Sequence, residues 1–112
     1  MRWPGSPSNP ARMSDLVVRL AERRFGLNGE LSFNTAAAVL RAAQTALRDE
    51  KGTVEIDLTA IRRVDSAGVA LLIELLRFAK QRDIALYFTH IPQQLESLAA
   101  VSGVDGLLPR LS

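Results

Sequence analysis

An acid and a hydroxyl stand side by side where the sequence passes from an extended segment into a helix. Asp65 and Ser66 follow a short loop, and Ala67 and Gly68 then open an apolar helical run. A serine here can act as the N-cap, because its hydroxyl can accept a hydrogen bond from a backbone N–H one turn later. The first turn also offers N–H groups and the positive end of the helix dipole, which stabilise an anion. The residue types therefore indicate a cap at Ser66, a regulatory site, or both.

Phosphorylation is the regulatory chemistry that Ser66 could undergo. A phosphate would place about two negative charges at the helix start, and the neighbouring Asp65 would repel them. Gly68 lacks a side chain, so it could let the backbone of a partner approach closely. The structural alternatives are a simple cap at Ser66 and a solvated loop charge at Asp65. The functional interpretation assigns partner binding to Asp65, Ser66, Ala67 and Gly68.

The residues that catalysis or metal binding would need are scarce. The chain has no cysteine and a single histidine, His90, which has no second imidazole with which to share a metal. Neither a nucleophile elbow nor a phosphate-binding GxxxxGK sequence occurs. Asp57 and Asp65 could in principle form an acid–base pair, but they flank a loop that carries no signal of a pocket. We therefore expect a protein that is not an enzyme and has no cofactor and no metal site.

The distribution of charge argues against nucleic-acid binding. The 112 residues include 14 Lys and Arg and 12 Asp and Glu. The excess comes from Arg2 and Arg12 in a proline-rich segment, so residues 13–112 are electrically balanced and lack a basic stripe. Residues 1–12 are expected to be a disordered extension, and residues 13–112 a single domain. The longest apolar run is five residues, far short of a membrane span, and no signal peptide is recognised, so we expect a cytoplasmic protein.

Hydrophobic periodicity predicts secondary-structure elements in the order β-β-α-β-α-β-α. In the clearest strand, TVEIDLT, apolar and acidic side chains alternate, as in a sheet with helices on one face and solvent on the other. A helix capped by Asn34 is expected after the opening hairpin, and strand–helix–strand units then imply a mixed sheet. The last residues, 107–111, would either add an edge strand or pack down. The expected strands are 16–20, 23–31, 53–59 and 84–89, and the expected helices are 34–48, 66–82 and 92 to about 102.

The helix that begins at Ser66 carries two apolar stripes. One stripe should pack on the sheet, and it consists of Val69, Leu72, Ile73, Leu76 and Ala79. The second contains Leu71, Leu75 and Phe78. Either neighbouring helices bury this second stripe, or part of it joins Ser66 and Ala67 in a docking surface. The docking hypothesis predicts that an aspartate at 71 or 75 abolishes partner binding while the domain stays folded. Core packing is expected for most of the aromatic side chains Phe25, Phe33, Tyr87 and Phe88.

The stretch DLTAIRRVDSAGVALL, residues 57–72, resembles the signature of STAS domains, which are named for sulfate transporters and anti-sigma-factor antagonists. The earlier LNGELSFNTAAAVL, residues 27–40, is similar to the passage from the first strands to the first helix of that family. The resemblance covers roughly residues 14–112. It implies an α/β fold, SpoIIAA-like, with a mixed sheet of four to five strands and helices on one face. It also places the family's regulated Ser or Thr at Ser66 and the preceding acid at Asp65.

Two branches of that family offer different functions. The sequence is more similar to the MlaB branch, which implies a regulatory subunit that binds the cytoplasmic ATPase of an ABC complex. That complex transports phospholipid and maintains outer-membrane lipid asymmetry, so contact with the membrane would be indirect, at the cytoplasmic face of the inner membrane. The other branch contains anti-sigma-factor antagonists, and it implies phosphorylation of Ser66 by an anti-sigma factor kinase. Ser66 stands where some MlaB proteins have threonine, and this keeps the second branch as the alternative.

Overall fold

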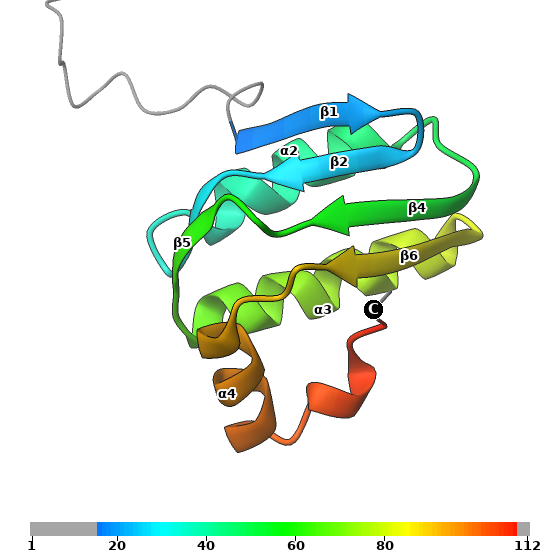
Figure 1. Ribbon diagram of the computed structural model, residues 1–112. Coiled ribbons are helices and arrows are strands. Elements are labelled where there is room, and N and C mark those ends of the chain that lie inside the picture. The colour runs from blue at the N-terminus through cyan, green and yellow to red at the C-terminus, as the bar shows by residue number, and fades with distance from the viewer. Residues whose placement is uncertain (1–15, 110–112) are drawn as a thin grey trace, which may run out of the picture.

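A four-stranded mixed sheet forms the centre of the protein (Figure 1). The computed structural model describes residues 16–109. The first two strands form an antiparallel hairpin, and the other neighbours in the sheet are parallel. The predicted mixed α/β fold is therefore confirmed. Across the sheet the order is β1 (Val17–Ala21), β2 (Arg24–Leu27), β4 (Gly52–Asp57) and β6 (Ile84–Thr89).

Two helices cover one face of this sheet and leave the other face open (Figure 1). They are α2 (Ala36–Leu47) and α3 (Ser66–Gln81), each in a crossover between parallel strands. Val54 and Ile56 of β4 are buried on the helix side, whereas Glu55 between them is only partly buried. The alternation in TVEIDLT thus has the predicted cause. A third helix, α4 (Gln93–Val101), lies beside α3, and a short 3₁₀ helix, η1 (Asp105–Leu107), packs against α4.

A second, two-stranded sheet brings the chain to the start of α3. Strand β3 (Gly29–Leu31) pairs in parallel with β5 (Ile61–Val64), and Leu31 lies opposite Val64. The sequence had predicted one continuous strand over residues 23–31 and a loop before Ser66. The strand breaks because Gly29 takes a φ of 91°, a conformation that glycine tolerates better than other residues. The segment 61–64 is short, and its two central side chains are exposed, so it lacks the alternation of apolar and polar residues that would predict a strand.

Several predicted boundaries shift in the structure. Thr35, not Asn34, is the N-cap of α2, and its hydroxyl donates to the carbonyl of Glu30 at 2.7 Å. The C-terminal segment forms η1 and then lies beside β6, where the N–H of Phe88 donates to the carbonyl of Pro109 at 2.9 Å. The predicted extension at residues 1–12 lies outside the described residues. Within residues 16–109, no helix is long and apolar enough to cross a membrane.

Candidate functional site

Asp65, and not Ser66, is the N-cap of helix α3. Its Oδ1 accepts from the backbone N–H of Ala67 at 2.8 Å and from that of Gly68 at 3.4 Å. Ser66 is the first residue of the helix itself, and its side chain is exposed. The prediction of a Ser66 cap is therefore wrong, because the preceding acid reaches the same amides. Asp65 is also not a solvated loop charge, the structural alternative considered from the sequence, because its carboxylate caps the helix.

The carboxylate of Asp65 also joins the start of α3 to a distant loop. Its Oδ2 accepts from the N–H of Phe33 at 3.0 Å. This hydrogen bond is the largest of the interactions that lower the pKa of Asp65. Desolvation raises the pKa by less, and the hydrogen bonds from the amides of Ala67 and Gly68 lower it further. The ionised carboxylate thus accepts hydrogen bonds from first-turn amides that an incoming anion would use. A phosphate on Ser66 would meet this negative charge.

Gly68 allows a close contact inside the molecule. A Cβ atom built on Gly68 would lie 2.7 Å from Cβ of Leu31 and 2.9 Å from its carbonyl carbon. The N–H of Asp65 donates to the carbonyl of Leu31 at 3.1 Å. The missing side chain therefore serves the packing of α3 on β3. This corrects the expectation that Gly68 makes room for a partner.

The expected docking stripe on α3 is buried. Leu71 is 3% exposed and Leu75 is fully buried, because α2 packs against this side of α3. Phe78 is half-buried, and the guanidinium of Arg82 lies 4.7 Å from its ring centroid. The stripe is therefore core, as the structural alternative held. Leu71 and Leu75 are not available as contact residues while the domain is folded.

One of the four aromatic side chains, most of which were expected in the core, lies exposed beside the helix start. Phe33 is 83% exposed, although its N–H is held by Asp65. The sequence did contain a signal for this, because Phe33 stands in the polar run Ser32–Asn34 just before a helix rather than in an alternating strand. Phe33, Ser66 and the half-buried Ala67 thus gather at one end of the helix layer. We call these three residues the α3-start surface.

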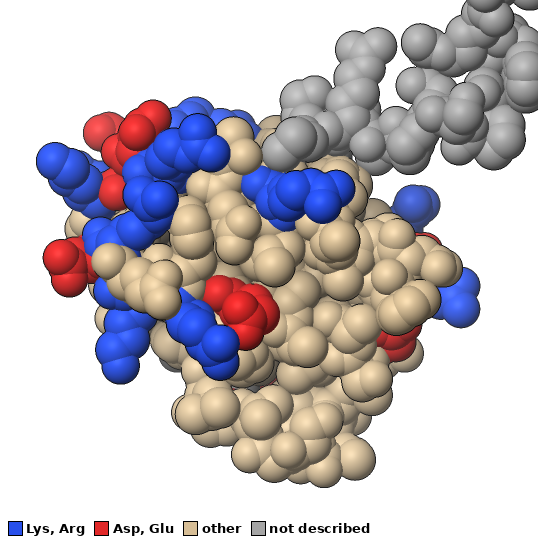
Figure 2. Space-filling view, turned by 180° about the vertical axis from the view of Figure 1, so that it is seen from behind, with Lys and Arg blue, Asp and Glu red and all other residues tan. Residues whose placement is uncertain are grey.

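A shallow groove continues from the α3-start surface toward the C-terminal part of the chain. Its volume is about 290 Å³. The space-filling view from the helix side shows most Lys and Arg toward the left, an acidic and a basic group near the middle, and uncharged areas to the right of these and below them (Figure 2). Apolar side chains make up most of the lining of this groove, although Glu74 and two serines also belong to it. The groove is lined by Ser66, Val69, Ala70, Ile73, Glu74, Ser102 and Val104.

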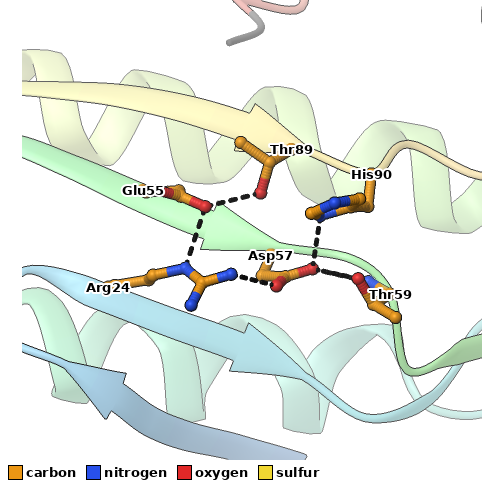
Figure 3. Close-up of polar contacts among 6 residues, drawn as sticks. All are labelled: Arg24, Glu55, Asp57, Thr59, Thr89 and His90. Carbon is orange, nitrogen blue, oxygen red and sulfur yellow. Dashed lines mark hydrogen bonds and ion pairs between the residues drawn. The ribbon is translucent and has the colours of Figure 1, made fainter. Parts of the chain in front are cut away.

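The open face of the sheet carries a separate polar cluster (Figure 3). Arg24 of β2 binds two carboxylates of β4, with Nε 3.0 Å from Oε2 of Glu55 and Nη2 2.7 Å from Oδ2 of Asp57. The hydroxyl of Thr89 on β6 donates to the same oxygen of Glu55 at 2.8 Å. These contacts join the three strands on the face that has no helices.

Asp57 also fixes the loop that leaves β4. Its Oδ1 accepts from the N–H of Thr59 at 2.8 Å and from the hydroxyl of Thr59, and it lies 3.2 Å from Nδ1 of His90. Burial raises the pKa of Asp57, but the Thr59 hydrogen bonds and the electrostatic interactions with His90 and Arg24 together outweigh it, so the pKa is lowered. Asp57 and Asp65 thus have separate sets of partners and do not form the acid–base pair considered from the sequence.

The described residues contain no group of three or more metal-binding side chains. Among residues 16–109, the polar contact found for His90 is with Asp57 and not with Ser66. The candidate site at the start of α3 and the polar cluster around Asp57 lie on opposite faces of the sheet (Figure 3).

Comparison with known proteins gives one family and several similar folds. The model of the family described as "Mlab, STAS domain" matches residues 16–109. The unphosphorylated anti-sigma factor antagonist SpoIIAA is 15% identical, with a TM-score of 0.64 and 86% of each chain covered. A proposed anti-sigma factor antagonist from Thermotoga maritima is 11% identical, with a TM-score of 0.66 and coverage of 84% of this chain and 83% of that one.

A third similar structure, described as Mglu, shares 30% identity over 70% of this chain but over only 19% of its own length, with a TM-score of 0.53. The search of curated proteins gave no match. The similarity to the two anti-sigma factor antagonist structures supports the fold of this chain.

Proposed function

Because the chain belongs to the MlaB-type STAS domain family, we propose that it is a non-catalytic regulatory and assembly subunit of a phospholipid-transporting ABC complex. It binds the cytoplasmic ATPase of that complex, and it meets the membrane only through this partner. By holding the ATPase in an active assembly it supports transport that maintains outer-membrane lipid asymmetry. Phospholipid transport and the ATPase enter this proposal from the MlaB resemblance of the sequence.

The exposed ring of Phe33 is the observation that supports a docking role for the α3-start surface. A side chain of this size that is 83% exposed leaves a large apolar area in water. Aromatic residues are among those that dominate binding energy when a partner covers them. The neighbouring Ser66 and Ala67 are small, so a partner could approach the helix closely around the ring.

The α3-start surface is held rigidly before any partner binds. The Phe33 backbone is tied to Asp65, and the first turn of α3 rests on Leu31. Preorganisation of this kind reduces the entropy lost on binding. In this proposal Asp65 and Gly68 act by positioning, whereas Phe33, Ser66 and Ala67 make contact. The assignment of partner contacts thus shifts from Leu71 and Leu75 to the residues around the helix start.

A binding measurement with the purified ATPase tests this assignment. Phe33→Ala should weaken binding at least about tenfold, because loss of an interface anchor costs more than about 1.4 kcal/mol. Ser66→Glu should also weaken it, because it adds charge to an uncharged contact. Leu20→Ala is the matched control, since Leu20 is an exposed apolar residue, 47% exposed, on β1. Unchanged affinity for both Phe33→Ala and Ser66→Glu would exclude the α3-start surface as the contact.

An anti-sigma-factor antagonist remains the second candidate, because the Ser66 side chain is exposed at the helix start and accessible to a kinase. In that case an anti-sigma factor kinase would phosphorylate Ser66, and the added charge beside Asp65 would break the contact with the partner. Affinity purification from the native cell separates the two functions. Recovery of an ABC ATPase and permease supports the first, whereas a kinase-like partner and an intact mass increased by one phosphate support the second.

A further inference from the structure

A second cavity lies at the end of the molecule where β5 leads into α3 (Figure 1). Its volume is about 690 Å³. It is lined by Leu16, by residues 28–30 at the start of β3, by Thr35, which caps α2, and by Arg62 and Arg63 of β5. None of these residues lines the groove at Ser66, so the two hollows are separate.

An irregularity in the two-stranded sheet brings two consecutive arginines to this cavity. In a regular strand, neighbouring side chains point to opposite faces. Here the register shifts, because Gly29 lies opposite Ile61 whereas Glu30 lies opposite Arg63. Such an irregularity re-aims side chains, and it explains why Arg62 and Arg63 line the same cavity.

The cavity and the α3-start surface are built from the same two segments of the chain. Glu30 and Thr35 line the cavity and flank Phe33 in the sequence. Arg63 lines it and stands three residues before Ser66. The two segments are joined by the hydrogen bond of 3.0 Å from the N–H of Phe33 to the carboxylate that caps α3. A partner that covers Phe33 and Ser66 therefore also reaches the rim of the cavity.

The rim of this cavity carries positive charge that the described part of the chain does not neutralise. The side chains of Arg62 and Arg63 are exposed, and neither forms an ion pair with another described residue. The nearby acids already accept other hydrogen bonds: Glu30 from the hydroxyl of Ser32 at 2.6 Å, and Asp65 from three backbone amides. The lining thus holds two guanidinium groups and one carboxylate, a net positive charge.

We propose that this cavity receives an aspartate or glutamate side chain of the ATPase that docks on the α3-start surface, and that Arg62 and Arg63 bind its carboxylate. The inference rests on the proposed function and adds the chemistry that the partner must present. A guanidinium holds its N–H donors in a planar fork that matches the two oxygens of a carboxylate. The partner thus supplies the negative charge that the lining lacks.

The exposure of both arginines favours a protein segment over a small free ligand. Small-molecule sites bury most of the surface of their ligand, whereas these two side chains stand in solvent. Protein interfaces have a polar rim around a buried centre, and they are enriched in aromatic residues and arginine. Phe33 is the apolar centre of such an arrangement, and Arg62 and Arg63 belong to its rim. Rim charges act mainly by speeding the association of the two proteins.

The rate of association with the purified ATPase, measured at low and at high salt, tests the proposal. Arg62→Glu combined with Arg63→Glu should slow association at least about tenfold at low salt, because like charges then meet. The difference should nearly vanish at about 1 M salt, where the Debye length is about 3 Å. Arg41→Glu combined with Arg48→Glu is the matched control, because it makes the same charge change at exposed arginines that do not line the cavity. This control should change the rate far less.

A conservative pair of substitutions gives an answer that does not need the charge-reversed variant to fold. Arg62→Lys combined with Arg63→Lys keeps the charge and introduces amines, which a carbodiimide couples to a carboxylate in contact with them. Mass spectrometry of the treated complex should find a bond between position 62 or 63 and an aspartate or glutamate of the ATPase.

The outcomes separate this inference from the function on which it rests. If charge reversal leaves association unchanged while Phe33→Ala still weakens binding, the inference is overturned and the proposed function stands. The absence of a cross-link at both positions also overturns it, and shifts of the Arg62 and Arg63 NMR signals on adding inorganic pyrophosphate would then assign the cavity to a phosphate-bearing ligand. If the unaltered protein does not bind the ATPase, the proposed function fails and the inference with it.

Discussion

Adding one methyl group at Gly68 should destabilise the domain. In most exposed helical positions Gly→Ala stabilises a helix by about 1 kcal/mol. At Gly68 the new Cβ would lie 2.7 Å from Cβ of Leu31 and 2.9 Å from its carbonyl carbon, and it would collide with the carbonyl oxygen. Much of this obstacle is backbone of β3, so it cannot turn away as the end of a flexible side chain could. The first turn of α3 must move instead.

The size of the effect follows from these two opposing contributions. Overpacking in a well-packed region costs about 1–3 kcal/mol, and the backbone contact places Gly68→Ala at the upper end of about 3 kcal/mol. Subtracting the helix propensity gain of about 1 kcal/mol leaves a net loss of about 2 kcal/mol. For a domain of this size such a loss corresponds to a decrease in Tm of roughly 8–16 °C.

Urea unfolding followed by circular dichroism measures this loss directly. Gly106→Ala is the matched control, because a Cβ at Gly106 meets nothing within 4 Å and its φ is not positive. The free energy of unfolding should fall for Gly68→Ala and stay nearly constant for Gly106→Ala. If Gly68→Ala is as stable as the parent or more stable, the close packing of α3 on β3 described above is wrong.

Three further predictions concern the core, the helix cap and the polar cluster. Leu75→Ala should lower the free energy of unfolding by about 2–5 kcal/mol, and Leu75→Asp should prevent folding, whereas Ala70→Asp on the exposed side of α3 should leave the circular dichroism spectrum native. Asp65→Ala should lower Tm and Ser66→Ala should not; the opposite order would restore Ser66 as the cap. The lowered pKa of Asp57 means that the unfolded chain binds its proton more readily, so stability should fall as pH decreases from about 4 through the folded-state pKa. Asp57→Asn should make that acid-side decrease shallower in a series of urea titrations, and an unchanged slope would contradict the assignment.

The alternation in TVEIDLT and the apolar spacing of the helices allowed the order of the main elements to be predicted. These patterns are local, because side-chain direction follows directly from the period of a strand or a helix. The same patterns did not reveal β3 and β5. Each has only three or four residues, and their pairing depends on bringing Leu31 and Val64 together across the chain.

The sequence drew attention to the start of α3, but it did not assign the capping role to the correct residue. Asp65 and Ser66 are adjacent, and both have side chains that can cap a helix. Only the tertiary structure decides between them, because Oδ2 of Asp65 receives the N–H of Phe33 from 32 residues earlier. That contact orients the carboxylate so that its Oδ1 reaches the first turn of α3.

Burial separates what sequence and structure each determined. The sequence by itself established that Leu71 and Leu75 share a stripe, that the stretch DLTAIRRVDSAGVALL resembles the STAS signature, and that an acid and a serine begin the helix. The tertiary structure decided that α2 covers that stripe and that Phe33 stays in water beside Ser66. The reason is physical: periodicity specifies which side chains point the same way, whereas exposure depends on which neighbouring element arrives to cover them.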